Sequence, residues 1–100
     1  MVESFFNKKS GCLTIRIEGR FDYSCHKTFK EAFMNTVGVT SCDVDLSRVT
    51  YLDSSALGML LLLRDYTGGD KANIRLIHAN DAATDILKIA NFHRLFVITE

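Results

Sequence analysis

The sequence contains no proline, so no stretch stands out as a rigid linker between two folded parts. No repeat or low-complexity segment divides the 100 residues either, and a chain of this length matches one domain of ordinary size. Hydrophobic residues make up 47% of the chain, which is enough for one compact core. We therefore expect a single domain that spans residues 1–100.

The chain has no excess of either charge, because 12 basic and 12 acidic residues give a formal net charge of zero. Domains that bind nucleic acid usually carry a broad basic surface, and anionic membrane surfaces attract basic clusters. The neutral chain has no such cluster. The sequence thus predicts neither a direct nucleic-acid contact nor a membrane contact.

No apolar run is long enough to span a bilayer. The longest is Leu60–Leu63, which follows further apolar residues from Ala56 onward, whereas a spanning helix needs about 20 apolar residues. The run predicts a helix that is mostly buried in the core. The N-terminus lacks the charged and then apolar pattern of a secretory signal, so we expect a cytoplasmic protein.

The cysteines Cys12, Cys25 and Cys42 are too few and too widely spaced for either of their usual shared roles. An odd number of cysteines makes a poor disulfide framework, and no pair has the spacing of a zinc site. We expect reduced, half-buried thiols in a reducing compartment. The three histidines are isolated in the sequence and predict surface or structural roles, so we expect no metal and no cofactor.

A hairpin is predicted at the start of the chain. Residues Cys12–Glu18 alternate between apolar and polar side chains, which is typical of a strand with one buried face. The turn residues Lys8–Gly11 precede this strand, so Val2–Asn7 is expected to form the other arm. Gly19 is expected to end the second strand.

A helix follows, for which Asp22 or Ser24 is the expected cap. Its apolar residues recur every fourth position from Cys25 to Val37, and it is expected to stop near Gly38. The later elements are a short strand at Cys42–Leu46, a helix at Ala56–Tyr66, a strand at Ile74–Ile77, a helix capped by Asn80 or Asp81, and a strand at Leu95–Ile98.

The order β-β-α-β-α-β-α-β predicts an α/β fold. Strands that are separated by helices favour parallel pairing with right-handed crossovers, while the opening hairpin makes the sheet mixed. We expect one mixed sheet flanked by helices. The polar residue Asp45 lies within the third strand and is expected to be solvated.

The stretch from Val44 to Gly58 carries the functional prediction. A strand is expected to end near Ser47, and a loop then leads to Asp53 and Ser54 at the start of a helix. Ligand and partner sites favour the loops that follow the carboxyl ends of strands in α/β sheets. The free N–H groups and the dipole at a helix N-terminus would accommodate a phosphate on a serine there. Such a phosphate adds about −1.5 to −2 charges and would repel a partner.

The run from Asp53 to Gly58 (D-S-S-A-L-G) resembles the D-S-[ST]-[GA]-L-G signature of the STAS domain of bacterial anti-sigma factor antagonists. Gly19 to Asp22 (G-R-F-D) is similar to the G-x-[LF]-D turn of that family, and Ile86 to Phe96 is similar to its third helix and last strand. The resemblance covers essentially the whole chain. Many members have Gly in place of Ala56, and many carry a fourth helix after the last strand, whereas this sequence ends at Glu100.

The resemblance implies a switch that works by phosphorylation. In the family, the serine directly after the Asp is phosphorylated, which points to Ser54 here. The unphosphorylated form binds an anti-sigma factor, often itself a serine kinase, and a serine phosphatase restores the complex after phosphorylation has broken it. The residues implied for the partner-binding face are Asp22, Asp53, Ser54, Ser55, Leu57, Gly58 and Leu61.

Other interpretations stay open. Asp53 and Ser54 are standard helix caps and need no further role on that ground alone. A STAS domain also serves as a constitutive subunit of larger assemblies, such as a lipid-transport ABC complex or a stress-signalling scaffold. A hydrolase with Ser54 as nucleophile needs an adjacent base, and the G-x-S-x-G elbow is absent. No GxxxxGK[ST] nucleotide loop is present either, so we expect no enzyme activity.

Overall fold

The computed structural model describes residues 1–100, and its strands form one five-stranded sheet in the order β1-β2-β3-β4-β5. β1 (Val2–Asn7) pairs antiparallel with β2 (Cys12–Phe21). β3 (Ser41–Leu52), β4 (Ile74–Ile77) and β5 (Val97–Ile98) then follow in parallel. The predicted mixed sheet and the order of its elements are confirmed.

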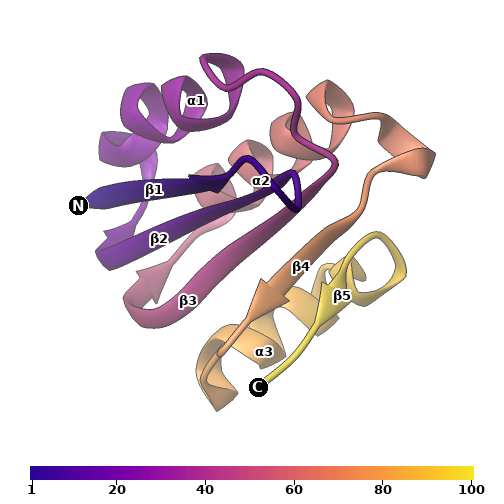
Figure 1. Ribbon diagram of the computed structural model, residues 1–100. Helices are drawn as coiled ribbons and strands as arrows, with labels where there is room; N and C mark the ends of the chain where they lie inside the picture. Colours follow the sequence, from indigo (N-terminus) through magenta and orange to yellow (C-terminus); the bar gives the residue numbers. More distant parts are fainter.

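Three α-helices connect the parallel strands, and all lie on one side of the sheet (Figure 1). They are α1 (His26–Met34), α2 (Ser54–Tyr66) and α3 (Asp81–Ile89), and short 3₁₀ helices lie at η1 (Tyr23–Cys25), η2 (Gly69–Lys71) and η3 (Phe92–Arg94). Right-handed crossovers that all step in the same direction across a sheet place every helix on the same face. The helices therefore cover one face of the sheet and leave the other open. None of them combines the length and the apolar character that a membrane crossing requires.

The core lies between the sheet and the helices. In β2, Leu13, Ile15 and Ile17 point toward the helices and are buried, while the intervening side chains face the open side. The alternation predicted for this strand is thus confirmed. Helix α1 packs against the sheet through Phe29, whose ring lies 5.4 Å from that of Phe21 between centroids.

The apolar run in α2 divides between core and surface. Leu60 and Leu63 are fully buried, whereas Leu61 and Leu62 are 38% and 37% exposed. Two adjacent leucines that point away from the core are the consequence of 3.6 residues per turn. The run is therefore an amphipathic helix segment, and only its core-facing leucines stabilise the sheet.

The open face of the sheet is held by cross-strand ion pairs. Arg75 on β4 makes two hydrogen bonds to Asp43 on β3, at 2.8 and 2.7 Å, and Arg16 on β2 lies 3.4 Å from Asp45. Asp45 is only 7% exposed, so the expectation of a solvated side chain is wrong. Although desolvation opposes it, hydrogen bonds from Ser47 and Arg16 lower the pKa of Asp45.

The first helix is shorter than its apolar spacing predicts. Helix α1 ends at Met34, and Val37 is 91% exposed rather than part of the core stripe. The chain must leave the helix here to reach β3, whose approach is tied to the first hairpin by a hydrogen bond from Thr40 N–H to the Gly11 carbonyl at 2.8 Å. The four-residue spacing of apolar side chains thus runs past the helix by coincidence.

Strands β2 and β3 are longer than predicted. Gly19 does not end β2 but adopts φ +87 within it, and β3 continues past Ser47 to Leu52. The β2–β3 register shifts twice, between Arg16 and Glu18 and between Gly19 and Arg20. Such irregularities break the two-residue alternation of apolar and polar side chains, so the sequence pattern did not predict the second half of β3. The last strand is shorter than expected because Leu95 caps η3 with a helical backbone and Phe96 N–H bonds back to the Phe92 carbonyl.

Candidate functional site

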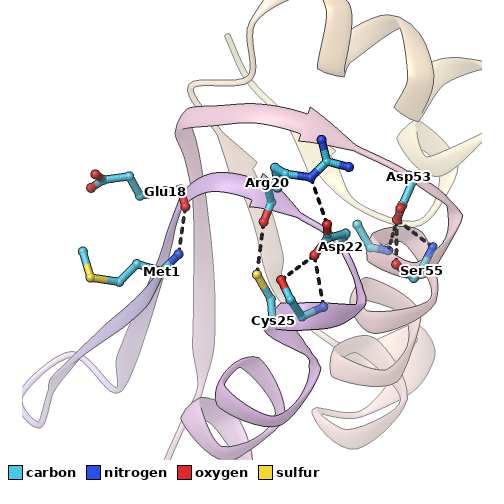
Figure 2. A network of polar contacts seen from close by, with 9 residues as sticks. Met1, Glu18, Arg20, Asp22, Cys25, Asp53 and Ser55 are labelled. Carbon is cyan, nitrogen blue, oxygen red and sulfur yellow. Dashed lines mark hydrogen bonds and ion pairs between the residues drawn. The ribbon is translucent and has the colours of Figure 1, made fainter.

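The candidate site lies where β2 and β3 end side by side (Figure 2). Phe21 pairs with Leu52 at the end of the ladder, so Asp22 and Asp53 follow at the same edge of the sheet. The structure thereby brings together two predicted site residues that are far apart in the sequence. Parallel neighbouring strands make this possible, because their carboxyl ends meet at one edge.

Asp53 caps helix α2. Its backbone is extended, and its Oδ1 accepts hydrogen bonds from the N–H groups of Ser55 at 3.0 Å and Ala56 at 3.3 Å. The Ser55 hydroxyl donates a third bond at 2.6 Å. The Ser55 hydroxyl is the main cause that lowers the pKa of Asp53; desolvation opposes it, and the Tyr51 hydroxyl adds to the lowering. Asp53 is thus a carboxylate at neutral pH.

Asp22 repeats this arrangement one strand away. Its Oδ1 accepts bonds from the N–H of Ser24 at 3.0 Å and from the Ser24 hydroxyl at 2.5 Å, which caps η1. Its Oδ2 accepts a bond from Arg20 Nε at 3.1 Å. These bonds, from Ser24 first and Arg20 second, lower the pKa of Asp22. Asp22, rather than the alternative Ser24, caps η1, whereas α1 itself has Cys25 at its N-cap and no side-chain cap bond.

Ser54 occupies the first position of α2 and is exposed, and its hydroxyl makes no hydrogen bond. The neighbouring Ser55 hydroxyl, in contrast, is held by Asp53. The first turn of α2 contains no acidic residue. Of the two serines, Ser54 therefore carries the hydroxyl that is exposed and makes no hydrogen bond.

The remaining predicted residues extend this surface along α2. Leu57 is half-buried, Gly58 is exposed, and Leu61 is 38% exposed. Spacings of three, four and seven residues from Ser54 place them on one side of the helix. A side chain added at Gly58 would meet nothing within 4 Å, so this side of α2 is open to solvent. We refer to the seven predicted residues from Asp22 to Leu61 as the switch face.

Arg20 and Tyr51 make a contact beside the capping aspartates that no sequence pattern predicted. The Arg20 guanidinium lies 3.8 Å above the centre of the Tyr51 ring, and it also bonds to Asp22. The Tyr51 hydroxyl also contributes to lowering the pKa of Asp53. Arg20 and Tyr51 are cross-strand partners, but no sequence signal predicted that β3 reaches Tyr51. Arg20 thus contacts both Asp22 and Tyr51, and these contacts lie where β2 and β3 end.

A groove of about 210 Å³ lies beside the switch face. One wall is the last part of β3, Val49–Leu52, and the other is the beginning of α3, with Ala82, Ala83 and Ile86. Asn80 closes one point of it by donating a 3.4 Å hydrogen bond to the Val49 carbonyl. The sequence did not predict this groove, since it too depends on the length of β3.

Residues 4–99 match the family described as "Mlab, STAS domain". A STAS-domain containing protein of Pseudomonas aeruginosa is 51% identical over 89 residues, which cover 87% of this chain and 87% of that protein.

Solved structures share the fold at low sequence identity. An anti-sigma factor antagonist of Mycobacterium paratuberculosis has a TM-score of 0.79 at 16% identity and covers 99% of this chain and 86% of its own. The phosphorylated form of SpoIIAA of Bacillus has a TM-score of 0.70 at 13% identity, and the match covers 100% of this chain and 92% of SpoIIAA. A serine-to-glutamate variant of RsbS of Moorella thermoacetica has a TM-score of 0.77 at 16% identity, and the match covers 97% of this chain and 84% of RsbS. With the family match over nearly its whole length, this chain belongs to the STAS domain family.

Proposed function

We propose that this chain is a cytoplasmic anti-sigma factor antagonist whose binding is switched by phosphorylation of Ser54. The unphosphorylated form binds an anti-sigma factor or a serine kinase through the switch face. Phosphorylation of Ser54 releases this partner, and a serine phosphatase restores binding. The observation that carries the proposal is the exposed Ser54 hydroxyl, which makes no hydrogen bond and directly follows the capping Asp53.

The fold is able to tolerate a phosphate at this position. The N-terminus of α2 has the positive end of the helix dipole, which stabilises an anion there. Ser54 lies outside the buried core, and the first turn of α2 has no other acidic side chain. We therefore expect phosphorylation to change the charge of the surface without changing the structure beneath it.

The same phosphate opposes docking of a partner. The carboxylates of Asp22 and Asp53 already make this edge negative, and both are kept ionised by their hydrogen bonds. A phosphate adds about −1.5 to −2 charges next to them. A partner that covers the switch face would have to remove water from these charges, and a carboxylate on the partner would also be repelled.

Three baits test the proposal in extract of the native host: the wild type, Ser54→Ala and Ser54→Asp. Ser55→Ala is the matched control, because it removes the neighbouring hydroxyl and leaves Ser54 in place. We expect Ser54→Ala and Ser55→Ala to retain a partner that Ser54→Asp loses. The intact mass of the endogenous protein should show a single phosphate that maps to Ser54.

The result that contradicts the switch is a partner held equally by all baits, with no phosphate on the endogenous protein. In that case Ser54 only begins a helix, and the chain is a constitutive STAS subunit of a larger assembly. Stoichiometric copurification with an ATPase subunit is the sign of that alternative. A catalytic role for Ser54 has no support in the geometry, because no histidine or other base is hydrogen-bonded to its hydroxyl.

A further inference from the structure

β3 is longer than the strand beside it. β4 pairs with β3 only from Cys42 to Asp45, whereas β2 pairs with β3 as far as Leu52. The last four residues of β3, Val49–Leu52, therefore have one edge paired with β2 and one edge without a neighbouring strand. The hydrogen bond from Asn80 to the Val49 carbonyl reaches this edge, and at 3.4 Å it is a long one.

The groove described above runs along this free edge. Six of its eight lining residues are hydrophobic, and its volume of about 210 Å³ admits an aliphatic side chain, since a cavity of about 150 Å³ binds benzene. On the α3 side, Ile86 is 36% exposed. Ile89, three residues further along the same helix, is 83% exposed and continues the apolar strip.

A free strand edge and an apolar groove together select the shape of what binds. The edge offers backbone N–H and C=O groups, which an extended peptide pairs with and a helix does not, because a helix uses its own backbone groups internally. The groove takes side chains that project from alternate positions of such a peptide. Four strand residues offer about 13 Å of edge, although the register shift between Val49 and Tyr51 makes it irregular and the Val49 carbonyl already accepts a bond from Asn80.

We propose that an extended segment of a partner protein, with aliphatic side chains at alternate positions, adds as a strand to the Val49–Leu52 edge of β3 and fills the groove against α3. This inference goes beyond the switch at Ser54, because strand addition requires no phosphate. The groove ends next to Asp53, so one partner can reach both the groove and the switch face.

The test begins with short linear peptides displayed on phage and selected on the immobilised wild-type domain. The peptide that binds most tightly is synthesised and titrated into ¹⁵N-labelled protein. We expect the largest shifts at the amides of Thr50, Tyr51 and Leu52, and slowed hydrogen exchange of the free-edge amides among them. The selected peptides should share aliphatic residues at alternate positions.

Two substitutions on α3 separate the groove from the rest of the surface. Ala82 is exposed and lines the groove, so Ala82→Gln places a longer side chain across it in a residue that helices accept. We expect this variant to lose about tenfold or more in peptide affinity. Lys88→Gln, on the opposite side of α3, is the matched control and should bind as the wild type does.

The proposal is overturned if no peptide is enriched, or if the bound peptide shifts the open face of the sheet or the outer side of α2 instead of β3. It is also overturned if the free protein forms a dimer that already protects the Thr50–Leu52 amides, since a second copy then fills the groove. Ser54→Ala must leave peptide affinity unchanged. A protein that binds the peptide but is never phosphorylated at Ser54 would contradict only the switch.

Discussion

At Asp53 and Asp22, the same three-residue pattern, an aspartate with a serine two positions later, forms a cap twice at one edge of the sheet. Each carboxylate accepts bonds from the backbone and from the hydroxyl of the serine two residues later. These bonds stabilise the ionised form, so the negative charge around Ser54 is a consequence of how the helices begin. The carboxylates near Ser54 therefore have a structural role as caps, independent of the proposed switch.

The cap at Asp53 predicts a difference between two substitutions. Asp53→Ala removes the acceptor for the N–H groups of Ser55 and Ala56, whereas Asp53→Asn keeps an acceptor oxygen there. We expect the alanine variant to lower Tm by about 4–8 °C and the asparagine variant to lower it by less. Thermal unfolding followed by circular dichroism measures both, and equal losses would show that the cap is not what stabilises α2.

The link between Arg20 and Tyr51 predicts a change in acidity. The Tyr51 hydroxyl contributes to lowering the pKa of Asp53, so Tyr51→Phe should raise that pKa. Arg20→Gln should likewise raise the pKa of Asp22, because the Arg20 hydrogen bond is lost. Carbon-13 NMR titration of the carboxyl groups measures both values. Tyr66→Phe, on the far end of α2, is the control that should leave them unchanged.

The sign of the accompanying pH dependence follows from these directions. A carboxyl group whose pKa is lower in the folded state stabilises the fold above its ordinary pKa of about 3.9, and that stabilisation is lost as the pH falls through the lowered value. Asp22, Asp45 and Asp53 all belong to this class. The domain should thus lose stability below about pH 4, and Asp45→Asn should weaken this dependence.

At the scale of elements, α2 serves both the core and the surface. Its buried side contributes Ala56, Met59, Leu60 and Leu63 to the core, while its other side carries the switch face. Such a division anchors the start of the helix rigidly beneath Ser54. On the proposed function, a partner would meet a preformed surface that it need not order, which lowers the entropic cost of binding.

This division predicts unequal effects of two similar substitutions in α2. Leu60 is fully buried, so Leu60→Ala leaves a cavity and should cost about 2–5 kcal/mol in the free energy of unfolding. Leu62 is 37% exposed, and Leu62→Ala should cost much less. Urea unfolding of both variants measures the difference. Similar losses in the two would contradict the orientation of α2.

Strands β2 and β3 show where reading by element fails. The alternation of β2 up to Glu18 is clear because each residue faces either the core or the open side. Beyond that point the register shifts, and in β3 the buried residues Val49 and Leu52 are three positions apart. A spacing of three residues is typical of one face of a helix and breaks the alternation of a strand, so the extension of β3 leaves no strand pattern in the sequence.

For the whole molecule, the burial of one face of the sheet decides which cysteine thiols can react with reagents in solution. Cys42 points into the core between sheet and helices, and burial raises the pKa of its thiol to about 12. Cys12 is half-buried, while Cys25 is also in the core. A thiol of such a high pKa has almost no thiolate at neutral pH and does not react.

Alkylation should therefore report on global unfolding. In the native protein we expect iodoacetamide to modify Cys12 first, and Cys42 only at the rate at which the domain unfolds. Mass spectrometry of peptides after timed labelling measures each rate. Labelling of all three cysteines at equal rates under native conditions would contradict the burial of Cys42, and addition of urea is the positive control.

Phosphorylation of Ser54, as proposed, should leave the fold and its stability unchanged. Ser54 lies outside the 23-residue core, so Ser54→Asp should keep the Tm within about 4 °C of the wild type, as expected for surface changes of up to about 0.5 kcal/mol. Its NMR spectrum should change only around the start of α2. Unfolding of this variant would show that release of a partner, if observed, reflects loss of structure.

The sequence by itself determined the order of elements, the core face of β2 and a helix start close to Asp53, because these depend on local periodicity and capping chemistry. Ser54 was singled out only by the resemblance to the STAS signature. Only the tertiary structure decided that Asp22 lies beside Asp53, that Arg20 stacks on Tyr51, and that β3 outruns β4 to leave an open edge. Those features depend on which strands pair and in what register. Pairing between distant segments depends on packing across the sheet, and neither residue of a pair carries it alone.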